Sequence, residues 1–334
     1  MTVLDLHTHV VPRETPFRTS AEPRWARLDT GTGVVSVSGK PFRTVHRVAW
    51  DLGARRAAAE AAGGTGQLLS AMPELLAPWA PPGEGLAYAQ AFNAWLADEV
   101  GQHNGFFTGL GVVPLQDPDA AADLLTEIAD AGLLGIEVPS NPPTAPLHAP
   151  AWAGFLDEAE RLGLLVFVHA AGGPGVADYP HPMAANGVLF PAGIGTALGG
   201  LIVTGALAAR PGLRLLASHG GGALITELPR IDYLRGITPA LRELMPESAV
   251  DSARRLWFDP LLFDAGLVRH LAGTVGPDRI VLGTDHPFMP TDPLAFLDDP
   301  ALPAGFAKAV RETNPAALLT ALTRPNSRQR SWRR

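Results

Sequence analysis

Histidines and one aspartate stand at the ends of short apolar runs in this sequence. The stretch VLDLHTHVVP (3–12) places His7 and His9 two residues apart, and His169 and Asp285 end the runs LLVFVHA and RIVLGTD. Because alternate residues of a strand point to the same side, both imidazoles of the first run can serve one site. Neutral imidazoles with one carboxylate suit a divalent metal ion. We therefore predict a metal site built from His7, His9, His169 and Asp285.

Two further polar residues fit this site without binding the metal. His219 ends the run LRLLASH and is predicted to act as a general acid/base beside the metal, where a pKa near neutrality is useful. Asp5 has the same parity as His7, so it is expected one step deeper, where it can accept a hydrogen bond and orient the site. A lone histidine at a strand end is more often structural, but the joint pattern favours chemistry.

The number and kind of metal ions follow from what the sequence offers. Zn²⁺ is predicted, one ion per subunit, with Mn²⁺ and Fe²⁺ as alternatives. The two lysines, Lys40 and Lys308, lie away from the fourth predicted strand, so a carboxylated lysine cannot bridge two metals there. Glu137 in that strand could bridge in principle, but a single ion is the simpler interpretation.

These residues need a scaffold that brings strand ends together. Helical patterns at 118–131, 150–162, 198–210 and 263–275 alternate with short apolar runs, as in a parallel sheet covered by helices. We predict an α/β protein that forms a (β/α)8 TIM barrel, in which the carboxyl ends of the strands build the active site. An open doubly wound sheet is the alternative, but no G-x-G-x-x-G follows the first run. The predicted strands are 2–7, 66–72, 106–113, 133–139, 164–170, 213–219, 255–260 and 279–285.

Two stretches interrupt the repeat. Residues 10–50 contain GVVSVSGKPFRTVHRVAW, which predicts a small β-hairpin with an SGKP turn, inserted after the first strand at the barrel mouth. Residues 171–197 are rich in Gly, Pro and Ala and are predicted to form a long loop over the site. We expect one metal-dependent barrel domain over 1–322 and a basic C-terminal tail over 323–334.

Composition limits the partners and the chemistry. The formal net charge of −7 and the lack of a basic cluster argue against nucleic acid, and no apolar run is long enough for a membrane span. The chain has no cysteine, which excludes thiolate ligands and cysteine nucleophiles. No secretory signal precedes the first run, so the cytoplasm is the expected location.

The motifs DLHTH, VHA, SHGGGALITELPR and LGTDHPF, together with FRTVHRVAWD and VVPLQDPDAA, resemble the amidohydrolase superfamily over nearly the whole chain. They resemble in particular its decarboxylase branch, typified by 2-amino-3-carboxymuconate-6-semialdehyde decarboxylase. The resemblance implies one divalent metal, usually zinc, on His7, His9, His169 and Asp285. It also implies that His219 acts on the metal-bound water, so His219 and Asp285 are the expected catalytic residues.

The same resemblance implies two arginines that grip substrate carboxylates, for which the bidentate guanidinium is suited. Arg43 in PFRTVHRVAW is the first, and Arg230 in HGGGALITELPR is the second. Arg230 is expected to reach the neighbouring site across a homodimer interface. The sequence departs from the branch at HAAGGPG and at His286, so the pocket is expected to differ in shape there.

The predicted function is a metal-dependent decarboxylase, a C–C lyase, of a small unsaturated or aromatic carboxylic acid. It would use a metal-bound water and a histidine acid/base. A metal-dependent hydrolase of an amide or lactone, or a hydratase of an unsaturated diacid, would use the same residues. A barrel that binds metal but catalyses no reaction is the third hypothesis. The presence of both His219 and Arg43 disfavours it. Release of CO₂ would separate these functions.

Overall fold

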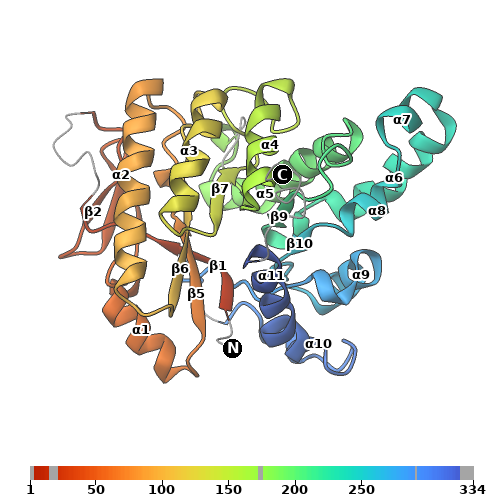
Figure 1. Cartoon of the computed structure of the whole chain (residues 1–334). Coiled ribbons are helices and arrows are strands. Elements are labelled where there is room, and N and C mark those ends of the chain that lie inside the picture. Colours follow the sequence, from red (N-terminus) through yellow and green to blue (C-terminus); the bar gives the residue numbers. More distant parts are fainter. Residues whose placement is uncertain (1–3, 15–21, 172–175, 290–291, 324–334) are drawn as a thin grey trace, which may run out of the picture.

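The computed structural model describes residues 4–14, 22–171, 176–289 and 292–323. Seven strands form one parallel sheet in the order β1-β5-β6-β7-β8-β9-β10, and helices surround it (Figure 1). Each of β5 to β10 begins within two residues of its predicted start, and the predicted start of β1 lies outside the described residues. The strands are β1 (Leu4–Val10), β5 (Gly66–Ala71), β6 (Phe107–Gly111), β7 (Gly135–Pro139), β8 (Leu165–His169), β9 (Arg214–Ala217) and β10 (Trp257–Phe258).

The segment 280–286 closes the sheet into a barrel between β10 and β1. Val281 N donates to Phe258 O and Leu6 N donates to Leu282 O, both at 2.8 Å. The pairing of this segment with its neighbours consists of isolated parallel bridges, at 8/286 and 258/280, rather than a continuous ladder. It lies where the eighth strand is predicted but is not a regular strand, and the backbone leaves the extended conformation at Asp285, where φ is 58°. The prediction of a (β/α)8 TIM-barrel fold is confirmed.

The helices lie on the outside of the sheet, and α3 shows why such a segment is helical. Asp117 caps its first turn by accepting from two backbone N–H groups, and Pro118 occupies the first helical position, where no N–H is needed. Its buried residues recur at 121, 124, 125 and 128, which is the period of one helix face. The helices are α1 (Leu52–Ala61), α2 (Pro82–Gly101), α3 (Pro118–Asp130), α4 (Ala153–Leu162), α5 (Pro182–Val203), α6 (Leu224–Ile237), α7 (Pro239–Leu244), α8 (Ala249–Ala253), α9 (Ala265–Val275), α10 (Phe306–Lys308) and α11 (Asn314–Thr323).

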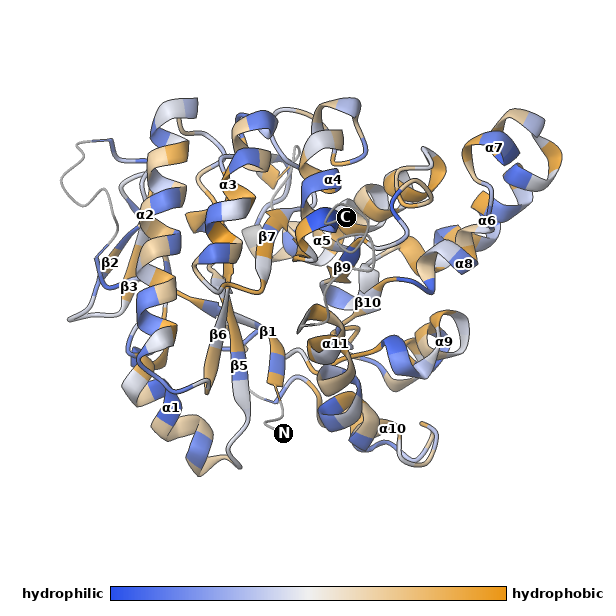
Figure 2. Cartoon of the chain, viewed as in Figure 1, coloured by the Kyte–Doolittle hydropathy of each residue, from blue (hydrophilic) through white to orange (hydrophobic). Residues whose placement is uncertain are grey.

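Two apolar clusters make up the core. The larger one joins the outer faces of the strands to the buried faces of the helices. The exposed faces of the helices are polar, so hydrophilic (blue) and hydrophobic (orange) residues alternate along α2 and α3 in Figure 2. The smaller one, which we call the interior cluster, fills the barrel, and Leu318 of α11 belongs to it. The interior cluster consists of Leu4, Leu6, Leu68, Leu110, Leu165, Phe167, Leu216, Trp257, Val281 and Leu318.

An irregularity in β1 decides which of its side chains reach the mouth. Asp5 pairs with Gln67 of β5, but Thr8 already pairs with Leu69, so β1 takes one residue more than its neighbour. Leu4 and Leu6 belong to the interior cluster, and Asp5 between them therefore points to the other side. The prediction that Asp5 shares the side of His7 is wrong, because the irregularity changes the alternation. Asp5 does accept hydrogen bonds, from Thr284 and from the backbone of His7.

Between β1 and α1 the chain forms a separate three-stranded antiparallel sheet of β2 (Arg27–Asp29), β3 (Val34–Val37) and β4 (Lys40–Thr44). Ser38 and Gly39 join β3 to β4, and both have positive φ, 54° and 71°. Next to this sheet, the Trp25 ring packs against Trp79 at 4.6 Å and against Tyr88 of α2 at 4.9 Å. Aromatic contacts thus anchor this part of the chain to the barrel wall.

The prediction of a loop over 171–197 is wrong, because residues 182–203 form α5. Proline is tolerated in the first turn of a helix, which accounts for the start of α5, and Pro191 lies inside it. The carbonyl oxygen of Pro191 accepts from Ala223 N at 2.9 Å, which ties α5 to the start of α6. Burial overrides the weak propensity, since Ile194, Leu198 and Leu201 of α5 are buried.

Within the described residues, Met183–Val203 is the helix long and apolar enough to cross a membrane by length and composition, and 39% of its apolar window is buried. A core helix passes the same test, so this is weak evidence for a span. Residues 324–334, most of the expected tail, lie outside the described residues, and the division at 322 stays a prediction.

Candidate metal centre

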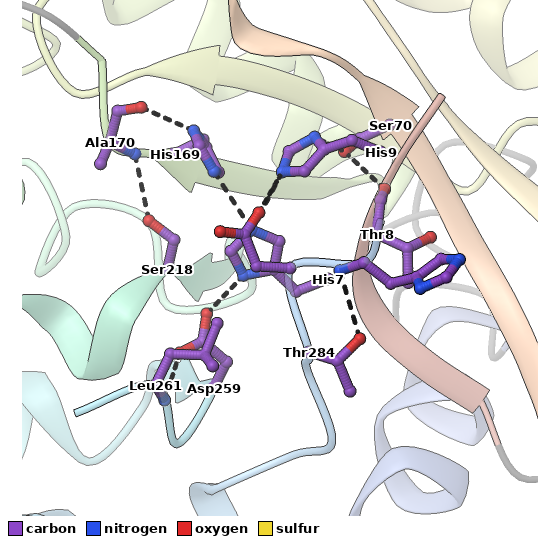
Figure 3. A network of polar contacts seen from close by, with 12 residues as sticks. His7, Thr8, His9, Ser70, His169, Ala170, Ser218, Asp259, Leu261 and Thr284 are labelled. Carbon is purple, nitrogen blue, oxygen red and sulfur yellow. Dashed lines mark hydrogen bonds and ion pairs between the residues drawn. The ribbon is translucent and has the colours of Figure 1, made fainter. Parts of the chain in front are cut away.

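The four predicted ligands meet at the mouth of the barrel. His7 and His9 come from β1, His169 ends β8, and Asp285 follows the closing segment. Each offers one ligand atom, all of these atoms lie within 4.8 Å of one another, and all four residues are buried. His7 Nε2 lies 3.1 Å from the Nε2 atoms of both His9 and His169, and Asp285 Oδ1 lies 3.1 Å from His9 Nε2 (Figure 3).

The other nitrogen of each imidazole faces an acceptor. His7 Nδ1 lies 2.7 Å from Asp259 Oδ2, while His9 Nδ1 and His169 Nδ1 face the backbone oxygens of Ala71 and Ala170 at 2.8 and 2.6 Å. Each Nδ1 must therefore carry a proton, which leaves the lone pair of a neutral ring on Nε2. Three lone pairs and a carboxylate then converge on one point. A divalent cation fits this donor set, and metal-binding histidines commonly make such outer contacts.

The electrostatics of the four groups disfavour protons on His9 and His169 but favour positive charge beside Asp285. Burial lowers the pKa of His9, and burial with the neighbouring histidines holds the pKa of His169 well below its usual range. Burial would also lower the pKa of His7, but Asp259 and Asp285 outweigh it and raise that pKa to about 10. Although burial opposes ionisation of Asp285, His7 and His9 hold its pKa well below the usual range. A metal ion at the Nε2 atoms would supply the required charge.

His219 lies beside this group but does not join it. Its ring centroid is 5.4 Å from that of His7 and 5.5 Å from that of His169. Its Nε2 is buried and has no hydrogen-bond partner among the described residues. Burial lowers its pKa, which favours the neutral form of the ring. The backbone of His219 has a φ of 50°, at the start of a turn that continues through Gly220.

Arg43 stands at the mouth and Arg230 does not. The guanidinium of Arg43 lies 4.2 Å over the ring of Phe288, which stacks on His9 with centroids 5.2 Å apart. Glu74 Oε1 lies 3.7 Å from Arg43 Nη2. Arg230 is exposed on α6, and no hydrogen bond or ion pair joins it to the part of the chain that the structure describes.

Two carboxyl groups near the ligands differ in their partners. Glu137 on β7 is fully buried, its Oε1 lies 3.9 Å from His169 Nδ1, and burial raises its pKa well above the usual range. It is not one of the four converging residues. Asp259 follows β10 and accepts from His7 Nδ1 and from three backbone N–H groups. Asp259 is not among the predicted site residues, although WFDP places it at the end of a predicted strand, as LGTD places Asp285.

Comparison with known proteins places the whole barrel in one family. The family described as Amidohydrolase matches residues 4–320 of this chain. The chain belongs to the amidohydrolase family. This amidohydrolase is 29% identical over 292 residues to the 2-amino-3-carboxymuconate-6-semialdehyde decarboxylase of Dictyostelium discoideum, covering 85% of the chain and 81% of that protein.

Solved structures share the fold of this amidohydrolase at low sequence identity. The 5-carboxyvanillate decarboxylase of Sphingomonas paucimobilis superposes with a TM-score of 0.80 and 19% identity, over 96% of this chain and 99% of that one. A dihydroxybenzoic acid decarboxylase from Polaromonas sp. JS666, solved with bound manganese and the inhibitor 2-nitroresorcinol, gives a TM-score of 0.76 and 18% identity, over 98% and 99%. The barrel is thus shared over nearly its full length.

Proposed function

We propose that this amidohydrolase is a metal-dependent decarboxylase of a small aromatic or unsaturated carboxylic acid. The observation that carries the proposal is the convergence of three Nε2 atoms and Asp285 Oδ1, with each Nδ1 held by an acceptor. The named activities of the relatives support the choice of decarboxylation, since the curated relative and both solved structures carry that name.

His7, His9, His169 and Asp285 would hold the metal. A bound divalent ion would act as a Lewis acid that activates water and polarises a substrate oxygen at neutral pH. We propose one zinc ion per subunit, because imidazoles with a carboxylate suit zinc. Manganese and iron are the alternatives, and manganese is bound in the Polaromonas structure. Metal analysis of the protein as purified from its source tests this choice.

Arg43 would hold the substrate carboxylate. Its guanidinium is kept in place by the Phe288 ring below it and by Glu74 beside it. A planar guanidinium can donate two parallel hydrogen bonds to a carboxylate, which fixes the orientation of a flat acid. Phe288 links Arg43 to His9, so the bound acid would lie between the arginine and the metal ligands.

His219 would deliver the proton that replaces the carboxyl group. Its Nε2 has no partner among the described residues, so it is free to exchange a proton with water and substrate. In the proposed step His219 takes up one proton from solvent at Nε2, which makes the ring cationic, and passes that proton to the carbon that bears the carboxylate. The bond from that carbon to the carboxylate then breaks, its electron pair restores the conjugated system, and CO₂ leaves. One proton is consumed for each CO₂ released.

We further propose a homodimer in which Arg230 reaches the neighbouring site. Arg230, Tyr233, Leu234 and Ile237 lie at the spacing of one helix face on α6, and all four are exposed. Tyr233 is 67% exposed and Ile237 61%, which is unusual for large apolar side chains. Helices α6 and α7 project from the barrel in Figure 1, in a position from which they could contact a second copy. Sedimentation analysis of the wild type and of Ile237→Asp tests the dimer.

One assay separates decarboxylation from the alternatives. The metal-loaded protein is incubated with 5-carboxyvanillate, 2,6-dihydroxybenzoate, 6-methylsalicylate and 2-amino-3-carboxymuconate semialdehyde, and in parallel with small amides, lactones and unsaturated diacids. We expect CO₂ from at least one of the acids, loss of that activity with a chelator, and its return with Zn²⁺ or Mn²⁺. Acid or ammonia release without CO₂ would instead show a hydrolase, and water addition a hydratase. The cytoplasmic location expected from the sequence stays a prediction, which cell fractionation tests.

A further inference from the structure

The carboxylate of Asp259 contacts both a predicted metal ligand, His7, and the backbone of the proposed acid/base, His219. Asp259 is fully buried and lies just after β10. Its Oδ2 accepts from His7 Nδ1 at 2.7 Å and from His219 N at 2.9 Å. Its Oδ1 accepts from Gly220 N at 3.1 Å and from Leu261 N at 2.9 Å. Four donors therefore share two oxygens, and Figure 3 shows two of them, His7 Nδ1 and Leu261 N.

The contact with His7 sets which nitrogen of that ring faces the metal position. A carboxylate without its proton can only accept, so His7 Nδ1 must donate. The Nε2 atom of the neutral ring is then left with its lone pair toward His9 and His169. Gly283 makes room for this contact, since a Cβ at that position would lie 2.7 Å from Asp259 Cβ and 2.8 Å from His7 Cβ.

The contact with the turn sets the backbone of His219. His219 has a φ of 50° and Gly220 a φ of 61°, a left-handed conformation that residues with a side chain adopt rarely. Two of the Asp259 hydrogen bonds go to the N–H groups of these two residues. The turn places the His219 ring beside the ligands, so a change in the turn would move the acid/base away from them.

We propose that Asp259 is a positioning residue that fixes the metal-binding tautomer of His7 and the left-handed turn of His219 through a single carboxylate. Asp259 thereby couples the metal affinity of the site to the position of the His219 ring. The inference rests on the proposed function only for the role of His219 in turnover. The hydrogen bonds themselves do not depend on it.

The variant Asp259→Asn tests this proposal. An amide offers one acceptor oxygen, and its NH₂ group must face donors on one of the two sides. Facing His7, it would force the ring proton onto Nε2 and oppose metal binding. Facing Gly220 and Leu261, it would repel their N–H groups and disturb the turn. We expect metal affinity, measured by competition with a chelator, to fall roughly 10–100-fold.

We also expect a lower kcat for Asp259→Asn at saturating metal, with a KM within about twofold of the wild type, because Arg43 is not touched. Amide hydrogen exchange at His219 and Gly220 should be faster in the variant than in the wild type. The matched control is Asp264→Asn, an exposed carboxylate that caps α9 through Leu267 N. It should leave metal affinity, kcat and these exchange rates unchanged.

A variant whose His219 and Gly220 amides exchange as in the wild type overturns the proposal, because either orientation of the amide opposes one of these two N–H groups. Wild-type metal affinity in Asp259→Ala, which removes both oxygens, overturns it as well. Affinity and exchange need no substrate, so they decide it even if the wild type releases no CO₂ from any acid. If Asp259→Asn does not fold, nitrogen-15 spectra of the zinc-loaded wild type decide instead. A protonated Nδ1 at His7 supports the proposal, and an unprotonated Nδ1 there overturns it.

Discussion

Two layers of the same barrel are equally buried but are stabilised in different ways. The interior cluster contains Leu6 on β1 and Phe167 on β8, and the mouth contains His7 and His169 on the same strands. Leu6 and His7 are consecutive in the chain, and one residue separates Phe167 from His169. Burial of an apolar side chain contributes about 1.5–3 kcal/mol without any partner. A buried imidazole or carboxylate costs free energy unless every polar atom finds a partner.

The comparison shows what each layer requires. In the interior layer, volume and shape are sufficient, so residues of similar size can replace one another. In the mouth layer, the Nδ1 atoms are satisfied by Asp259 and by backbone oxygens, while the Nε2 atoms converge. The mouth is therefore complete only with a cation. The following predictions test whether metal binding and turnover depend on the mouth layer and fold stability on the interior layer, from the largest expected effect to the smallest.

Replacing His7 by alanine should abolish both metal binding and turnover. His7 Nε2 lies 3.1 Å from the Nε2 atoms of His9 and His169, so its loss removes the central metal ligand. It also leaves Asp259 with one donor fewer. Metal content by elemental analysis and CO₂ release by a coupled assay measure the two losses. Circular dichroism should show the barrel intact, and a variant that binds metal as the wild type does would contradict the assigned ligands.

Replacing His219 by alanine should lower turnover by about 10²–10⁴-fold, the usual contribution of a general acid/base, while the protein keeps its metal. The reason is that the His219 ring is 5.4 Å from His7 and stands outside the four-residue group. Elemental analysis and steady-state kinetics on the same preparation make the test. Metal loss in this variant would show that His219 is a ligand.

Replacing Leu110 by alanine should destabilise the fold by about 2–5 kcal/mol, because it leaves a cavity in the interior cluster. Metal affinity should stay unchanged, since Leu110 contributes no polar group to the mouth. Denaturant unfolding of the metal-free protein gives the first quantity and chelator competition gives the second. Weaker metal binding by the folded variant would mean that the two layers cannot be separated.

Replacing Arg43 by lysine should raise KM about tenfold and change kcat less. An ammonium cannot make the bidentate contact and stacks less well than the guanidinium that lies 4.2 Å over Phe288. The antiparallel sheet of β2, β3 and β4 would stay in place, because Trp25 beside it packs against Trp79 and not against Arg43. Steady-state kinetics with a carboxylic acid substrate measure the effect, and a change confined to kcat would argue against a binding role.

Most of the scaffold could be predicted from local patterns. Apolar runs bounded by turns marked the strands, and the strand-end rule marked His7, His9, His169 and Asp285, which the structure brings together. Residues 182–197 of α5 were missed because their Gly and Pro content favours a loop, and tertiary burial decided their conformation. The position of Asp5 was missed because one extra residue in β1 changes the alternation, which a pattern of period two cannot show.

The residue types at the strand ends were set by the sequence alone, and with them the donor set for a divalent cation. The absence of cysteine excluded thiolate ligands, and the absence of lysine near the fourth strand excluded a carboxylated lysine that would bridge two metals. Only the tertiary structure decided which nitrogen of His7 and of His9 faces the centre, because Asp259 and Ala71 lie 252 and 62 residues from these partners in the sequence, whereas Ala170 directly follows His169. Hydrogen-bond partners are chosen by contact in space, and the sequence records only neighbours along the chain.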